Sequence, residues 1–301
     1  MLSIILLAVV AVALLTLPLR PTNQVYGKPL SEDGFLSLTV ARNIAEGNGV
    51  TADSQGAPTN GFQPLFTFVT VPVFWIAGED SAPALRLILL LQILVLLATG
   101  LVLGAIVADT FPRSGLAQRT VVVLTALAYS SAIFVIVNGL NGLETGFLLL
   151  MYTVVWRVYQ VRGLANIRDG ALLGGLMGAL VLTRIDAMVL VVVCCVYIAL
   201  GRRNGAIVRA AVVGGTAALV SITFCNLVRS CRRARNENSS GQSAASAWPS
   251  LPLHGVRRVF LGYIFLATPH LLTSRALSLD SRSWPPSWAG GCGGTELLER
   301  A

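Results

Sequence analysis

Runs of apolar residues separated by short polar segments dominate the first 228 positions of the chain. A membrane-spanning helix needs about 20 predominantly apolar residues. We therefore predict an all-α, polytopic transmembrane helical bundle of about seven spans, at residues 2–19, 84–108, 120–137, 145–160, 171–183, 187–200 and 207–228. The first run lacks the basic start and the small-residue cleavage site of a signal peptide, so we interpret it as a retained helix.

Two shorter patterns within residues 20–83 predict helices of another kind. Apolar residues recur at helical spacing in residues 34–47, with Arg42 on the opposite, polar face, and the Gly-Asn-Gly at 47–49 is a typical helix stop. The apolar stretch 61–78 is short and contains two prolines, which break a regular helix. We predict two juxtamembrane helices that lie at the membrane interface.

Small residues four positions apart mark one predicted span. Gly170, Gly174 and Gly178 share one helix face, and this spacing lets two helices approach closely in lipid. A glycine loop that cradles a cofactor is the alternative, but no predicted strand precedes these residues. We predict a close helix–helix contact along this face.

Composition agrees with a membrane protein. The 301 residues are 54% hydrophobic and 12% charged, with mean hydropathy +0.73 and net charge +8, whereas soluble domains carry about 25% charged residues. A basic excess in a soluble protein would suggest nucleic acid, but here the arginines fall in short loops between apolar runs. We therefore predict membrane lipids, and no nucleic acid, as partners.

The sign of the charge in each loop predicts the topology. Arginines outnumber carboxylates in the loops at 109–119, 157–169 and 201–206. Positively charged loops stay in the cytoplasm, so we expect a cytoplasmic N-terminus and an extracytoplasmic loop at 20–83. If 61–78 crossed the membrane, the basic loops would lie outside, which is why we place that helix on the outer interface. The predicted location is the inner (plasma) membrane of a bacterium.

The sequence contains no recognisable pattern for a cofactor or a metal. Its five cysteines and two histidines form no cluster with metal-ligand spacing, and it has no phosphate-binding loop of the Walker type. We expect no resident cofactor and do not favour a divalent metal. The missing phosphate-binding loop argues against an ATP-driven pump.

Ionisable residues lie at the predicted extracytoplasmic ends of several helices: Glu32, Asp33, Glu144, Arg184 and Asp186. An ionisable residue at the boundary of a span is a candidate functional group. Each also has a purely structural interpretation, because carboxylates are favoured at helix N-termini and an Arg–Asp pair can tie two helix ends together. Their convergence on one face of the membrane favours a functional site.

Carboxylates beside an arginine suit group transfer from a lipid phosphate. A carboxylate can deprotonate a hydroxyl acceptor, and a guanidinium matches the oxygens of a phosphate. A donor whose tail lies in the bilayer requires no soluble nucleotide. Arg42, in the same predicted loop as the acidic pair, is a further candidate for substrate binding.

Four segments in this order resemble the GT-C superfamily of polytopic glycosyltransferases: EDGFLSLTVARNIAEGNG, TNGFQPLFTF, NGLETGFLLL and LTRIDAMVL. That superfamily includes protein O-mannosyltransferases, the lipid A aminoarabinose transferase and bacterial polyprenyl-phosphate-sugar transferases. The resemblance covers roughly residues 1–228. It implies an integral-membrane glycosyltransferase of the cell envelope, with two juxtamembrane helices in its first extracytoplasmic loop.

The resemblance also implies roles for individual residues. Family members usually carry Asp-Asp or Asp-Glu where this chain has Glu32 and Asp33, and the first carboxylate tends to be the general base, so both are catalytic candidates. Glu144 would lie at the catalytic cavity, Arg184 would contact the donor phosphate and Asp186 would orient it. The implied reaction moves a sugar from a polyprenyl-phosphate-linked donor to a hydroxyl of a lipid, glycan or protein acceptor, by an inverting displacement.

Residues 229–301 differ in composition from the rest of the chain. Several arginines follow a span that should end outside, which violates the charge rule obeyed before it, at Arg229, Arg232, Arg233 and Arg235. The remainder is rich in Trp, Pro, Gly and Ser and has no periodicity. We interpret residues 1–228 as the catalytic module and 229–301 as a poorly ordered tail that arose from a disturbed reading frame or an early end. A genuine basic tail is the alternative.

Two other functions are compatible with this sequence. A transporter or flippase would use the charged face as a gate, but it should show internal repeats and ionisable residues deep within its spans. A truncated, inactive glycosyltransferase is the other. The sugar, the acceptor and the choice between Glu32 and Asp33 as the base do not follow from the sequence.

Overall fold

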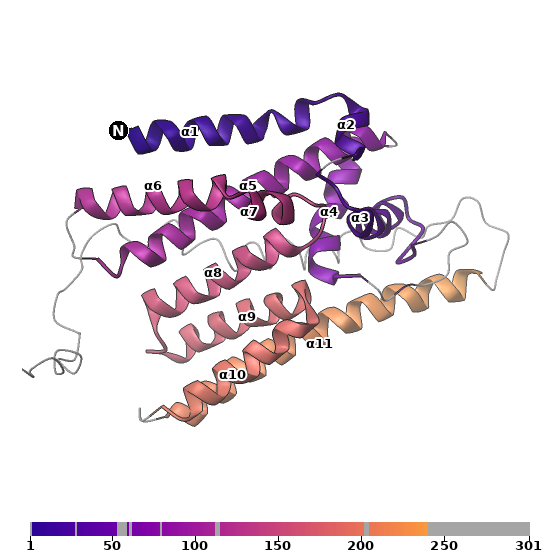
Figure 1. Cartoon of the computed structure of the whole chain (residues 1–301). Coiled ribbons are helices and arrows are strands. Elements are labelled where there is room, and N and C mark those ends of the chain that lie inside the picture. The colour runs from indigo at the N-terminus through magenta and orange to yellow at the C-terminus, as the bar shows by residue number, and fades with distance from the viewer. Residues whose placement is uncertain are drawn as a thin grey trace, which may run out of the picture. The chain divides into compact units, whose positions relative to one another are not determined.

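The computed structural model describes residues 2–27, 29–52, 59, 62–78, 80–111, 115–201 and 205–239, and every structural statement below refers to these residues. Their regular elements are all helices, which confirms the predicted all-α class for this part of the chain. The elements, drawn in Figure 1, are α1 (Leu2–Leu15), η1 (Leu17–Leu19), α2 (Thr22–Gly27), α3 (Glu32–Ala45), α4 (Pro64–Ala77), α5 (Ser81–Ala108), α6 (Gly115–Ser131), α7 (Ile133–Gly139), α8 (Thr145–Arg162), α9 (Ile167–Thr183), η2 (Ile185–Ala187), α10 (Met188–Ala199) and α11 (Ala206–Ser239).

Apolar side chains pack into three clusters. The first joins α2, α3, α4 and α5. The second joins α8, α9, α10 and α11. The third joins α1, α5 and the residue that follows α7. Helix α5 contributes to two of these clusters, so it is the central element against which the N-terminal helices pack.

The glycine face of α9 forms the contact with α11, as predicted. The two helices lie side by side (Figure 1). A Cβ atom at Gly174 would overlap the backbone of Val213 and the side chain of Thr216, and one at Gly178 would lie 2.8 Å from the carbonyl oxygen of Ala217. Because only glycine leaves room for this approach, the spacing serves helix packing.

Helices α3 and α4 confirm the two helices predicted between residues 20 and 83. Helix α3 ends where the Gly-Asn-Gly sequence predicted, and Gly47 and Gly49 adopt φ angles of 90° and 81°, which glycine tolerates best. The prolines of α4 do not break it, contrary to expectation. Pro64 occupies the first turn, where no hydrogen bond is lost, and Pro72 lies inside the helix, which continues to Ala77.

The structure does not support the predicted count of seven spans. Two described helices are long and apolar enough to cross a membrane: α5, with 28 residues, and Ala206–Asn226 within α11, with 21. A third requires that α6 and α7, which are bent by 68°, form one span. The other predicted spans form helices of 18 residues or fewer: α1 has 14, α8 has 18, α9 has 17 and α10 has 12. Helices of this size are roughly 18–27 Å long, against a hydrocarbon core of about 30 Å.

Helix α11 continues through residue 228, where we predicted the end of the catalytic module, and ends at Ser239. The predicted tail beyond this helix, residues 240–301, lies outside the described residues.

Candidate functional site

The turn between α7 and α8, residues 140–144, is the centre of the candidate site. Leu140 is fully buried in the third apolar cluster, and Phe147, in the first turn of α8, packs against the first cluster. The turn contains Gly142 with φ of 84°, and Leu143 N–H donates to Asn141 Oδ1 at 3.0 Å. Two apolar clusters therefore hold a polar turn from both sides.

The start of α3 is bound to this turn. The backbone N–H and the hydroxyl of Ser31 both donate to the carbonyl oxygen of Asn141, at 2.9 and 3.0 Å. A Cβ atom at Gly34 would lie 2.5 Å from the same oxygen, so glycine permits the close approach. Glu32 and Asp33 occupy the first turn of α3 and are exposed. The acidic pair therefore lies on the solvent-accessible side of this junction.

Glu144 follows the turn and is buried. It occupies the N-cap position of α8 but makes no side-chain capping bond, and only 3% of the residue is exposed. One carboxylate oxygen lies 3.8 Å from Arg184 Nη1, and the other, Oε2, has no hydrogen-bond partner in the described chain. Burial raises the pKa of this carboxyl, and the Glu144 backbone N–H and the Arg184 charge oppose the shift only in part.

Arg184 and Asp186 lie where α9 ends. Arg184 is the C-cap of α9 and adopts an extended conformation, which turns the chain into η2. Its Nε donates to Asp186 Oδ1 at 3.1 Å, and its side chain is 42% exposed. The guanidinium is thus shared between a buried carboxylate, Glu144, and an exposed one, Asp186, while part of it faces outward.

Gln92 of α5 is a residue of this site that the sequence analysis missed. It is 3% exposed, its Nε2 donates to the carbonyl oxygen of Leu143 at 3.2 Å, and its Oε1 is buried without a partner in the described part of the chain. The signal in the sequence was an amide side chain inside the apolar run 84–108, in which Arg86 and Thr99 are the other polar residues. Gln92 supports the backbone next to Glu144 and leaves a second unsatisfied acceptor there.

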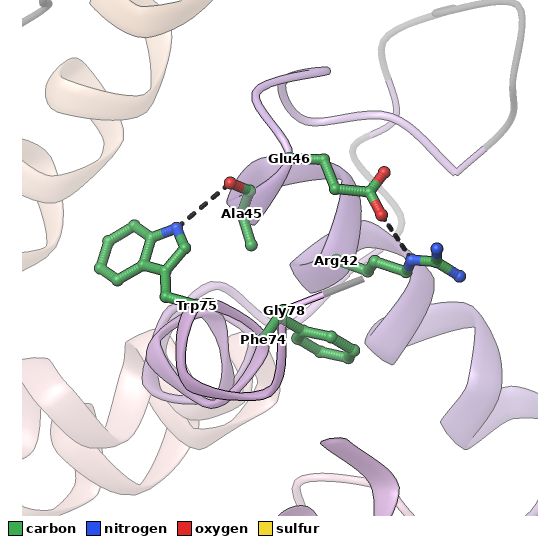
Figure 2. A pocket seen from close by; sticks show the side chains of 6 residues that line it. All are labelled: Arg42, Ala45, Glu46, Phe74, Trp75 and Gly78. Carbon is green, nitrogen blue, oxygen red and sulfur yellow. Dashed lines mark hydrogen bonds and ion pairs between the residues drawn. The ribbon is translucent and has the colours of Figure 1, made fainter. Parts of the chain in front are cut away.

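Arg42 lies apart from these residues, at the other end of α3. It is ten residues beyond Glu32, roughly 15 Å along the helix axis. Its Nε donates to Glu46 Oε1 at 2.6 Å, and both side chains are exposed by two fifths or more. Figure 2 shows this pair beside α4, where Trp75 Nε1 donates to the carbonyl oxygen of Ala45 at 3.2 Å. These residues line a pocket of about 230 Å³, together with Phe74 and Gly78.

The structure thus groups five of the six predicted site residues around one junction. Glu144, Arg184 and Asp186 are joined by ion pairs. Glu32 and Asp33 stand on the turn of α3 that binds residue 141. Among the described residues, no group of three or more His, Cys, Asp and Glu side chains is arranged to hold a metal ion.

No family model matches this chain, and the comparisons with curated proteins and with solved structures also find no match.

Proposed function

We propose that the protein is an integral-membrane glycosyltransferase that moves a sugar from a polyprenyl-phosphate-linked donor to an acceptor hydroxyl. The observation that carries the proposal is the junction at residues 141–144. On one side it binds the start of α3, which bears two exposed carboxylates, and on the other it carries Glu144, which pairs with the half-exposed Arg184. Such a transfer requires a base and a phosphate-binding cation near one reacting centre, and this turn contacts one element that carries candidates for the base and one residue that is a candidate for the cation.

The proposed reaction is a single displacement. The acceptor hydroxyl gives its proton to Glu32 or Asp33 while its oxygen attacks the anomeric carbon of the donor. The bond from that carbon to the phosphate oxygen breaks, and polyprenyl phosphate leaves with the electron pair. Arg184 stabilises the charge that develops on the leaving phosphate, and Asp186 fixes the direction of the guanidinium through the bond to Nε. Attack from the opposite face inverts the anomeric centre.

The finer parts of the proposal concern the membrane. The site lies at the extracytoplasmic face of the inner membrane, with the N-terminus in the cytoplasm, since the basic loops of the sequence are then cytoplasmic. The donor enters from the bilayer, and the acceptor is a lipid, a glycan or a protein. Arg42 lies at the far end of α3 from Glu32 and Asp33. Its proposed contact is therefore with a part of the substrate that lies away from the reacting centre.

One observation favours a transporter or flippase as a second candidate. Helices α6 and α7, which precede the turn at residues 140–144, meet at a bend of 68°. Broken helices next to a charged site are typical of transporters. Movement of a lipid-linked sugar across vesicles without formation of a glycoside would select this function.

The test is sugar transfer from an added radiolabelled polyprenyl-phosphate hexose in membrane vesicles that contain the full chain together with the lipid, glycan and protein acceptors of the cell envelope. The double variant Glu32→Gln, Asp33→Asn is expected to lose at least 100-fold in rate, the order of magnitude that general base catalysis contributes, roughly 10²–10⁴-fold. Arg184→Lys is expected to lower the rate as well, because a point charge replaces a planar donor.

The matched control is Asp109→Asn, which also converts a carboxylate to an amide. Asp109 follows α5 and pairs with Arg157, about 40 Å along α5 from its first residue. This variant should retain the wild-type rate. Equal rates for the double variant and the control would overturn the assignment of the base.

A further inference from the structure

The buried carboxylate of Glu144 is poorly compensated in the structure. Its nearest cation atom, Arg184 Nη1, is 3.8 Å away, beyond direct hydrogen bonding, and its second oxygen has no partner in the described chain. The neighbouring Gln92 Oε1 is also a buried acceptor without a donor. Two buried acceptors beside one turn therefore lack a donor among the described residues, and a proton on Glu144 Oε2 would turn one of these acceptors into a donor.

The charged groups around Glu144 come from few elements. Arg184 and Asp186 act on it from the end of α9, and Glu32 and Asp33 lie at the start of α3, which binds the preceding turn. On α5 the neighbouring residue is the neutral Gln92, and Arg86 of the same helix donates to Thr22 Oγ1 instead. Helix α7 and the first two turns of α8 carry no charged side chain. Arg184 is thus the cation on which the ionised form of Glu144 depends.

We propose that a phosphate group bound by Arg184 is bound together with one proton, which Glu144 takes up. The inference rests on the proposed function, because it assumes that Arg184 binds the donor phosphate. When the guanidinium turns to phosphate oxygens, an ionised Glu144 remains as a buried charge without a partner, and such a charge is strongly unfavourable. A proton from solvent converts the carboxylate to a carboxylic acid, and release of the ligand returns the proton and restores the ion pair.

The direction of the pH dependence follows from this exchange. Burial already raises the pKa of Glu144, and the charge of Arg184 opposes that shift. An anion bound to Arg184 reduces the electrostatic stabilisation that this cation gives to the Glu144 carboxylate. The pKa of Glu144 is therefore higher in the complex than in the free protein. The complex therefore binds more protons than the free protein, and affinity for the phosphate increases as the pH falls between the two pKa values.

The test is isothermal titration calorimetry of the full chain in detergent with a water-soluble, short-chain prenyl phosphodiester of a hexose. A phosphodiester keeps a single charge between pH 5 and 8, roughly, because it lacks the second ionisation of a monoester near pH 6. Titrations in PIPES and in Tris, which differ in ionisation enthalpy, report the protons taken up on binding. We expect uptake approaching one proton per ligand. Between the pKa of Glu144 in the free protein and its pKa in the complex, the Kd should decrease about tenfold for each unit by which the pH is lowered.

The variants separate this inference from the proposed function. Glu144→Gln should bind the phosphodiester with no proton uptake and with a Kd independent of pH, whereas Asp109→Asn should behave as the wild type. Binding without proton uptake by the wild type, or uptake that persists in Glu144→Gln, overturns the role of Glu144 and leaves the proposed function standing. Absence of binding by the wild type overturns the phosphate role of Arg184, and both proposals with it. If Glu144→Gln does not fold, the comparison of buffers on the wild type still tests the inference, because binding without proton uptake overturns it.

Discussion

Among single residues near the candidate site, Ser31 makes two structural hydrogen bonds with its side chain. Its hydroxyl accepts a hydrogen bond from Gly34 N–H at 3.1 Å and donates to the carbonyl oxygen of Asn141 at 3.0 Å. The first bond caps α3, and the second ties the helix to the turn before α8. One side chain thus fixes both the beginning of the helix that bears the acidic pair and its position against the rest of the site.

We expect Ser31→Ala to lower the free energy of unfolding by about 2 kcal/mol. Loss of a capping hydroxyl costs about 1 kcal/mol, and loss of a part-buried hydrogen bond to the other segment adds about 1 kcal/mol. Asp80→Ala removes a cap alone, since Asp80 Oδ1 accepts from Ala82 N–H at 2.9 Å at the start of α5, and should cost about 1 kcal/mol. Equilibrium unfolding in mixed detergent measures both, and equal losses would contradict the second role of Ser31.

The charged residues of the site could be predicted from the sequence, because ionisable side chains stand out at the ends of apolar runs. Arg184 and Asp186 stood at the end of an apolar run, so their approach to Glu144 could be predicted from topology alone. Gln92 could not, because its partner is the backbone carbonyl of Leu143 and a carbonyl leaves no trace in the sequence. The separation of Arg42 from the other site residues follows from the length of α3, which the periodicity of residues 34–47 predicted but which the assignment of Arg42 to the site did not take into account.

At the scale of elements, the pairing of α9 with α11 depends on which glycines face the neighbour. A Cβ atom at Gly174 would overlap the backbone of Val213, whereas one at Gly175 would meet no heavy atom within 4 Å. The two positions are adjacent on the same helix, so they differ in contact but not in helical environment.

Gly174→Ala and Gly175→Ala should therefore change stability in opposite directions. Overpacking at a close contact costs about 1–3 kcal/mol, so Gly174→Ala should lower the thermal unfolding midpoint. Gly175→Ala gains helix propensity, about 1 kcal/mol, and should raise the midpoint by about 2–4 °C. Thermal unfolding in detergent, followed by intrinsic fluorescence, distinguishes the two. A decrease of similar size in both variants would show that the helix tolerates no side chain for a reason other than this contact.

The bend between α6 and α7 shows why span counts fail when they rest on composition. Residues 120–137 are apolar apart from Tyr129 and a few threonines and serines, and we predicted one span there. The chain instead bends by 68° next to Ser130 and Ser131. The Ser131 hydroxyl donates to the carbonyl oxygen of Ala128, which competes with the helical hydrogen bonds. A serine pair is a known cause of kinks. The two adjacent serines therefore indicated the bend, although the apolar composition of the whole run did not.

At the scale of the whole described chain, α5 separates two groups of residues. Its 28 residues extend about 42 Å, more than the hydrocarbon thickness of about 30 Å. At its first residue, the Ser81 hydroxyl is 2.6 Å from the hydroxyl of Tyr26, in the loop predicted to be extracytoplasmic. Past its last turn, Asp109 pairs with Arg157, next to a loop predicted to be cytoplasmic. Helix packing and loop charge therefore divide these residues in the same way.

This division predicts the accessibility of two exposed positions, Asn48 and Thr110. In a chain whose five cysteines are replaced by serine, Asn48→Cys should react with a membrane-impermeant maleimide in right-side-out membrane vesicles. Thr110→Cys should react only after the vesicles are opened, because the thickness of the bilayer separates the two ends of α5. Both positions are exposed in the structure, so protein packing alone does not protect either of them. The reverse pattern would place Glu32 and Asp33 in the cytoplasm, and the acceptor would then have to be a cytoplasmic hydroxyl.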